Sequence, residues 1–281
     1  MRDTRDMLLV LLSSLLMLTG CSRRDILDDY PVSGVDIKLD WDGMTDQLPE
    51  GVRVIFYPKN GEGRKVDKYL SVKGGKVKVP PGRYSVVVYN YDTETVQIRG
   101  EEAYETIEAF TGHCNGLGIA GTEQLVWGPD PLYVVRIDDL KIENSEEELQ
   151  LNWKPKLVVK TYSFKLKVQG LEYVSSIVGS IEGMSSCYDL GLGCGKAGDS
   201  PIYFAARGSA GEVTGSFTVF GTSEGVISRA GNAIKLTLAF VKTDNKVQKM
   251  EVDITEVIAN SESGGSGGDD DGDEPFKEIE L

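Results

Sequence analysis

Tyr162-Ser-Phe-Lys-Leu-Lys-Val-Gln169 alternates apolar and polar side chains without interruption. Successive side chains of a β-strand point to opposite faces, so this period of two predicts a strand with one buried and one solvated face. The same period returns from Ile234 to Phe240 and from Met250 to Ile254. The carboxyl-terminal half is therefore expected to be built from half-buried strands.

The amino-terminal half also reads as strands. Val52-Arg-Val-Ile-Phe-Tyr57 and Tyr84-Ser-Val-Val-Val-Tyr89 are rich in β-branched and aromatic residues, and the turn signal Pro80-Pro-Gly82 precedes the second run. The only helical spacing, at Ala103, Ile107 and Phe110, is too short to define a helix. Strands without helical crossovers predict an all-β fold of antiparallel sandwiches.

A chain of 281 residues exceeds the usual single domain and suggests two. Leu149, Leu151 and Trp153 look like the last strand of a first unit, and Pro155 marks a boundary after Lys154. We predict a first β-sandwich over 35–154 and a second over 155–259.

The last 22 residues, 260–281, have a composition of their own. Gly, Ser and Asp dominate the first part, which cannot bury enough apolar surface to order itself and predicts a flexible acidic tail. Metal binding by its aspartates is not expected, because their spacing does not fit a calcium loop. A strand-like tip follows, with Phe276, Ile279 and Leu281 as its apolar residues.

The amino terminus has the layout of an export signal. The apolar run from Met7 to Leu18 follows Arg2 and Arg5, and is shorter than the ~20 residues that a membrane span requires. Leu18-Thr-Gly-Cys21 resembles the bacterial lipobox, in which the cysteine is lipidated and becomes the new amino terminus. We predict a signal peptide over 1–20 and a lipidated linker over 21–34.

The lipobox resemblance implies several acyl chains, such as palmitate, on Cys21, enough for stable anchoring. Acidic residues after the cysteine, from Asp25 to Asp29, fit a tag for surface export, although Arg23 and Arg24 depart from it. We expect an outer-membrane lipoprotein displayed at the cell surface. The alternative is a soluble periplasmic protein whose cysteine falls there by chance.

Cys114, Cys187 and Cys194 are the remaining cysteines, an odd number for an oxidising compartment. Cys187 and Cys194 flank a glycine-containing loop and could form a disulfide. A metal set with His113 and Cys114 is less favoured because no C-x-x-C pair is present. We therefore expect these cysteines to form one loop disulfide or to be incidental thiols, and we do not expect them to bind a metal.

Other chemistry finds little support. A net charge of −14 argues against nucleic acid. The string from Gly193 to Gly198 matches G-x-G-x-x-G, but the strand-like Pro201-Ile-Tyr-Phe204 follows it where a nucleotide fingerprint needs a helix. His113 is the only histidine, so a catalytic triad has one possible base and no evident partner. We expect neither an enzyme nor a cofactor, and no small-molecule ligand is indicated.

Several segments in order carry a resemblance along nearly the whole chain: the lipobox at Cys21, Val35-Asp-Ile-Lys-Leu-Asp-Trp41, Tyr89-Asn-Tyr-Asp-Thr-Glu94, Trp127-Gly-Pro-Asp-Pro131, Thr161-Tyr-Ser-Phe-Lys-Leu-Lys167, Ser180-Ile-Glu-Gly-Met184 and the acidic tail. Together they resemble a family of Bacteroides-type lipoproteins similar to fimbrillin anchor and minor-subunit proteins. The resemblance implies two tandem transthyretin-like β-sandwiches and a part in pili assembled by strand exchange, with other fimbrial subunits as partners.

The functional hypothesis is therefore a membrane-anchored structural anchor or minor subunit of a fimbria. An open sheet edge is a template for an added strand, so the tip, through Phe276, Ile279 and Leu281, is predicted to engage a neighbouring subunit. The tip could instead fold back on its own domain. The alternative function is a glycan-binding surface lipoprotein without a pilus role, using exposed aromatics among Trp41, Trp127, Trp153 and the tyrosines.

Overall fold

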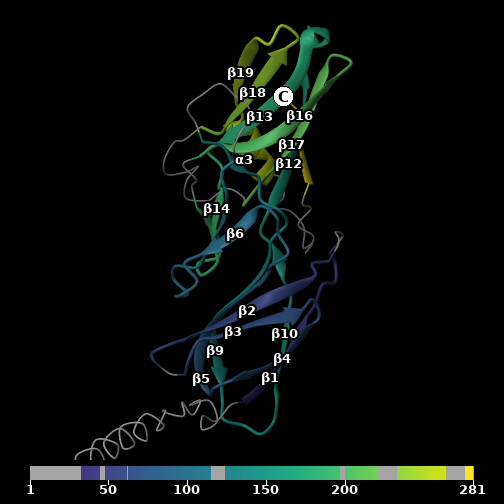
Figure 1. The fold of residues 1–281 in the computed structure, drawn as a ribbon. Helices are drawn as coiled ribbons and strands as arrows, with labels where there is room; N and C mark the ends of the chain where they lie inside the picture. Colours follow the sequence, from purple (N-terminus) through teal and green to yellow (C-terminus); the bar gives the residue numbers. More distant parts are fainter. Residues whose placement is uncertain are drawn as a thin grey trace, which may run out of the picture.

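The computed structural model describes residues 33–44, 48–61, 63–114, 124–196, 200–220, 233–263 and 276–280. Strands are the main regular element of these residues, which also contain the helix α3 (Thr255–Ser263) and the short 3-10 helix η2 (Leu171–Tyr173). The molecule is elongated, with a large sheet toward each end and a small sheet between them (Figure 1). The predicted all-β class with multiple antiparallel sheets is confirmed.

The first large sheet has eight strands in the order β10-β1-β4-β3-β2-β5-β9-β11. Their bounds are β1 (Ser33–Leu39), β2 (Gly51–Pro58), β3 (Val66–Ser71), β4 (Gly74–Val79), β5 (Gly82–Asn90), β9 (Tyr133–Ile142), β10 (Leu149–Trp153) and β11 (Lys156–Leu157). Neighbours pair antiparallel except β1 and β10, which run parallel. The predicted strand runs beginning at Val52 and Tyr84 fall inside β2 and β5.

The second large sheet follows the order β19-β18-β13-β16-β17-β12-β20, with the short β8 (Val126–Trp127) pairing beside β16. Its strands are β12 (Lys160–Lys167), β13 (Val174–Glu182), β16 (Ile202–Ser209), β17 (Glu212–Val219), β18 (Lys235–Lys242), β19 (Val247–Asp253) and β20 (Phe276–Glu280). Each alternating segment predicted from the sequence lies mostly within one of these strands, β12, β18 or β19, and extends one or two residues beyond it.

The small sheet has the order β15-β14-β7-β6. Its strands are β6 (Val96–Arg99), β7 (Glu108–Thr111), β14 (Cys187–Asp189) and β15 (Cys194–Lys196). Residues from both halves of the sequence therefore share one sheet. The division into sandwiches over 35–154 and 155–259 stays a prediction, and this shared sheet is a connection between them that the sequence did not indicate.

Each large sheet curls around its own core. In the first, Ile37 of β1 and Trp153 of β10, from one end of the strand order, join the same buried cluster as Val86 of β5, near the other end. In the second, Tyr162 and Phe204 each pack against Phe217, with ring centroids 5.4 and 5.5 Å apart. Burial of these side chains supplies the main stabilisation of each half.

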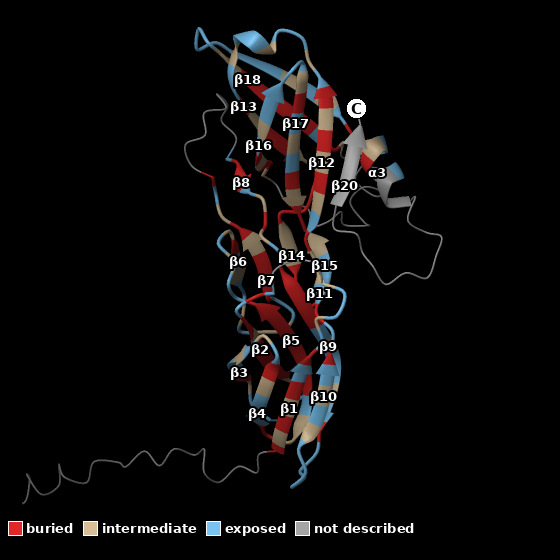
Figure 2. Ribbon diagram, turned by 90° about the vertical axis from the view of Figure 1, so that its right-hand side faces the viewer, coloured by how far each residue is buried: buried red, intermediate tan, exposed pale blue. Residues whose placement is uncertain are grey.

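The central strands of the first sheet are buried on both faces. On β5, Val86 faces the sheet's own core, whereas Val87 packs with Ile107 of the small-sheet region and Leu190. Figure 2 shows β5 buried from Tyr84 to Asn90, while β12 alternates between buried and partly exposed residues. The small sheet thus covers a face that would otherwise expose an apolar surface.

The sequence did not predict the helix α3, which begins at Thr255 and carries the fully buried Ile258 into the second core. Thr255 holds the start of this helix to the sheet, because its hydroxyl accepts a hydrogen bond of 2.7 Å from the amide of Ile234. The weak helical spacing at Ala103, Ile107 and Phe110 forms a turn followed by β7.

Candidate functional site: the joint between the halves and an open strand edge

The joint between the two halves is a ladder of backbone pairs. Strand β7 runs antiparallel to β14, with Ala109 opposite Tyr188 and Glu108 opposite Asp189. The last pair sets two buried carboxylates side by side, with 7% and 2% of their surfaces exposed. Like charges directly opposite each other destabilise a sheet unless a cation lies between them.

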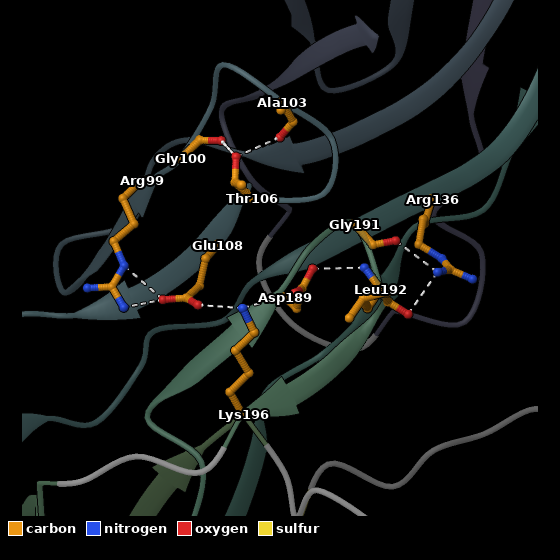
Figure 3. A network of polar contacts seen from close by, with 10 residues as sticks. All are labelled: Arg99, Gly100, Ala103, Thr106, Glu108, Arg136, Asp189, Gly191, Leu192 and Lys196. Carbon is orange, nitrogen blue, oxygen red and sulfur yellow. Dashed lines mark hydrogen bonds and ion pairs between the residues drawn. The ribbon is translucent and has the colours of Figure 1, made fainter. Parts of the chain in front are cut away.

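Lys196 supplies that cation from the neighbouring strand β15. Its ammonium lies 2.7 Å from Glu108 Oε2 and 2.9 Å from Asp189 Oδ2. Arg99 approaches Glu108 from β6 and donates a hydrogen bond of 2.8 Å from Nε to Oε1 (Figure 3). All four strands of the small sheet therefore contribute to one ion-pair network.

Protonation at the joint follows from this network. Burial on its own would raise the pKa of Glu108, but hydrogen bonds from Lys196 and Arg99 outweigh it and lower the pKa of that carboxyl. The same contacts with Glu108 and Asp189 raise the pKa of Lys196. Both directions favour the charged forms of Glu108 and Lys196, so this ion pair stabilises the joint.

A turn of the small sheet is fastened to the first sheet. Arg136 of β9 donates hydrogen bonds of 2.9 and 2.7 Å to the carbonyls of Gly191 and Leu192 (Figure 3). Asp189 Oδ1 accepts a bond of 2.8 Å from the Leu192 amide. Gly191 is required here, since an added Cβ would lie 2.0 Å from the carbonyl oxygen of Tyr104.

The cysteines take the second of the two arrangements considered from the sequence, that of free thiols. Cys187 and Cys194 are free thiols, and Cys187 lies opposite Lys196 while Cys194 lies opposite Asp189. The two cysteines are therefore offset by two places along the β14–β15 ladder, whereas a disulfide in such a ladder is favoured between closely facing Cβ atoms. Cys114 is a buried free thiol, and its burial raises its pKa.

A second feature is the edge of the second large sheet. Strand β20 lies beside β12 and runs parallel to it, with Thr161 opposite Phe276 and Phe164 opposite Ile279 (Figure 1). The tip of the tail thus adds a strand to its own half, which is the alternative arrangement considered from the sequence. Engagement of a neighbouring subunit by Phe276, Ile279 and Leu281 stays a prediction, and Leu281 lies outside the described residues.

Other predicted residues fall at separate places. Cys21, the signal peptide and the acidic spacer lie outside the described residues. Trp153 is buried, the half-buried Trp41 donates a hydrogen bond of 2.7 Å to the Val72 carbonyl, and Trp127 is 37% exposed with its ring edge-on to another aromatic ring. His113 forms an isolated bridge with Val126, apart from the charged network. In the parts of the chain that the structure describes, no cluster of three or more His, Cys, Asp or Glu side chains could hold a metal ion.

None of the helices in the described ranges is both long enough and apolar enough to cross a membrane.

The geometry defines an all-β protein whose two main features are the joint between its halves and the strand edge at β12. The chain belongs to the family described as Domain of unknown function (DUF5119), whose model matches residues 20–205. Along 100% of its length it is 63% identical to a Bacteroides ovatus protein named as fimbrium anchoring subunit Fim4B, of which it covers 88%.

Solved structures show the same fold. A crystal structure of a Bacteroides ovatus protein described as an adhesin matches with a TM-score of 0.79 and 59% identity, and 94% of each chain is covered. The fimbrial anchor protein Mfa2 of Porphyromonas gingivalis matches with a TM-score of 0.57, covering 89% of this chain and 90% of that one. At 12% identity the second likeness is one of fold.

Proposed function

We propose that this chain is a lipid-anchored outer-membrane subunit that attaches a fimbrium to the cell surface, as its anchor or as a minor component. The observation that carries the proposal is the 63% identity, along the whole chain, to a protein named as a fimbrium anchoring subunit. The lipobox ending at Cys21 supports the membrane attachment.

The fold suits a load-bearing role. Force between the two ends of an elongated anchor passes through the joint, where backbone pairing between β7 and β14 is reinforced by the Glu108, Asp189 and Lys196 network. The buried cluster that includes Val87, Ile107 and Leu190 joins the first sheet to the small sheet over the same region. This construction favours a structural protein over a catalyst.

Attachment is tested with Cys21→Ser. We expect the variant to leave the membrane fraction and to release fimbriae into the medium, because the lipid chains are lost. Cys194→Ser is the matched control: it removes an exposed thiol outside the lipobox and should leave both readouts unchanged. Retention of Cys21→Ser in the membrane fraction with attached fimbriae would contradict the proposal.

The tail is proposed to exchange between copies or subunits. A strand that pairs with its own β12 edge through main-chain hydrogen bonds has the chemistry to pair with the same kind of edge on a neighbour. The spacer before it is rich in Gly and Asp, a composition that favours a long, soluble connection.

Truncation after Ser263 tests the exchange, since it keeps α3 and its buried Ile258 while removing β20. Cells carrying the native fimbrial subunits are analysed by immunoblot without boiling. We expect a ladder of large species from the full chain and its loss on truncation or in Ile279→Asp/Leu281→Asp, whereas Glu278→Gln/Glu280→Gln keeps it. An unchanged ladder in the truncated chain would exclude exchange through the tail.

A further inference from the structure

An exposed tyrosine pair lies on the first large sheet. Tyr69 of β3 is 63% exposed and Tyr91, directly after β5, is 43% exposed. Their ring centroids are 5.2 Å apart, with an interplanar angle of 79°. Gly51 leaves room for this contact, because an added Cβ there would lie 2.7 Å from the Tyr91 hydroxyl.

A fixed guanidinium borders the pair. Arg53 of β2 lies opposite Tyr69 in the strand register, and its guanidinium carbon is 5.4 Å from the Tyr69 ring centroid. Asp67 binds it with two hydrogen bonds, of 3.0 and 2.7 Å. Glu101 holds its other side, and Tyr89 accepts a bond of 2.9 Å from Nη1. The side chain of Arg53 is therefore already oriented before any ligand arrives.

The carboxylates of this group remain partly open to solvent. The side chains of Asp67 and Glu101 are each 31% exposed, compared with 17% for Arg53. A carboxylate can accept several hydrogen bonds at once, so one held by arginine can still accept from a ligand hydroxyl. The face thus offers exposed aromatic rings beside preoriented acceptors.

Cations already partner the acidic groups beside the tyrosine pair. Arg53 pairs with the carboxylates of Asp67 and Glu101. Lys65 donates a hydrogen bond of 2.5 Å to the backbone carbonyl of Glu101, and its ammonium lies 5.2 Å from the Tyr57 ring centroid. Arg53 occupies one side of the Tyr69 ring, so a ligand has the remaining exposed surface of Tyr69 and Tyr91 to pack on. This arrangement favours an uncharged ligand.

We propose that this tyrosine face, formed by Tyr69, Tyr91, Arg53, Asp67 and Glu101, binds a neutral saccharide. A pyranose with equatorial hydroxyls has an apolar C–H face that packs on a tyrosine ring, and its hydroxyls donate to carboxylates at the ring's edge. Rings fixed by neighbouring contacts lose little conformational entropy on binding. The site does not depend on the fimbrial role and adds saccharide recognition to it.

Titration calorimetry with cellohexaose and laminarihexaose, whose glucose units have equatorial hydroxyls, tests the proposal. The protein is the mature chain with Cys21→Ser, which stays free of lipid. We expect measurable binding of at least one hexasaccharide, weakened about tenfold or more by Tyr69→Ala and by Tyr91→Ala. Tyr173→Ala is the matched control, since Tyr173 is also 63% exposed but lies in η2 of the other half.

The same variants separate this site from a subunit contact. Tyr69→Ala should leave the unboiled ladder of subunits unchanged, so loss of the ladder together with unaltered saccharide affinity would overturn the proposal. Failure of both hexasaccharides to bind would also overturn it, as would an equal loss of affinity in Tyr173→Ala. None of these results depends on whether fimbriae detach in Cys21→Ser.

Discussion

The first and second large sheets use their outer faces differently. In the first, β5 is buried from Tyr84 to Asn90, with successive side chains entering different cores. In the second, β12 buries Tyr162, Phe164 and Leu166 and leaves the intervening residues at least partly exposed. A covered face allows a continuous β-branched run, whereas a solvated face requires alternation.

The difference locates the rigid and the adaptable parts of the molecule. The central strands of the first sheet are covered on both sides, by the sheet's own core and by the small sheet. The second has one solvated face and an edge, at β12, whose neighbour β20 arrives from the far end of the chain. Exchange of strands is therefore expected at the second sheet and transmission of load at the first.

Placing a charge on the covered face gives the largest expected effect. Val87→Asp puts a carboxylate into a fully buried position between the first sheet and the small sheet. We expect a loss of more than about 4 kcal/mol in the free energy of unfolding, because the charge has no partner there. Thr214→Asp, on the exposed face of β17, should change it by less than about 0.5 kcal/mol. Urea unfolding of both variants measures the difference between their free energies of unfolding. Similar losses of stability in the two variants would contradict the prediction.

Weakening the joint gives an intermediate effect. Glu108→Gln removes the charge-assisted hydrogen bonds from Arg99 and Lys196 at a buried position. We expect the free energy of unfolding to fall by about 2 kcal/mol. Glu143→Gln breaks an exposed pair with Lys141 and is expected to leave urea unfolding unchanged. Equal changes in the free energy of unfolding of the two variants would show that the buried ion pairs of Glu108 add no stability beyond that of an exposed pair.

The stability that Glu108 contributes is expected to depend on pH. The pKa of Glu108 is lowered in the folded protein, so its charged form stabilises the fold above the unfolded-state pKa of about 4.3. That contribution is lost as pH falls through the lower folded value. The stability difference between the native chain and Glu108→Gln should therefore shrink between about pH 5 and pH 3. A constant difference over this range would mean that Glu108 is not ionised in the joint.

Removing the added strand gives the smallest effect on stability. Truncation after Ser263 deletes β20 and returns β12 to the sheet edge, but leaves the second core with Ile258 in place. Only a few backbone hydrogen bonds at an edge are lost, so we expect less than about 1 kcal/mol in urea unfolding. A loss several times larger would make β20 an integral strand and argue against its exchange.

The sequence predicted local features well where one physical rule dominated. Alternation identified β12 and β19, and β-branched runs identified β2 and β5. Both signals come from side-chain direction along a strand, which is a local property. The helix α3 was not predicted because it begins directly after the alternating segment that ends at Ile254. Its buried residue, Ile258, continues the same spacing of two, so the sequence pattern does not show where the strand gives way to a helix.

The candidate sites depended on contacts that no local pattern encodes. Glu108 and Lys196 are 88 positions apart, and Arg53 meets Glu101 across 48. The sequence offered the tryptophans and the tyrosines alike as exposed aromatic residues, and the structure exposes Tyr69 and Tyr91 while it buries Trp153. The exposure of an aromatic side chain depends on whether a distant segment packs over its strand.

The order of residues alone determined the all-β class and the strand character of the tail tip, since each rests on composition or short-range spacing. The export signal and the lipobox ending at Cys21 rest on the same kind of local pattern and stay predictions. The folded chain alone showed the sheet shared by both halves, the free state of Cys187 and Cys194, and the edge at which β20 pairs. These depend on strand register between distant segments, and register is set by how buried faces pack together in three dimensions.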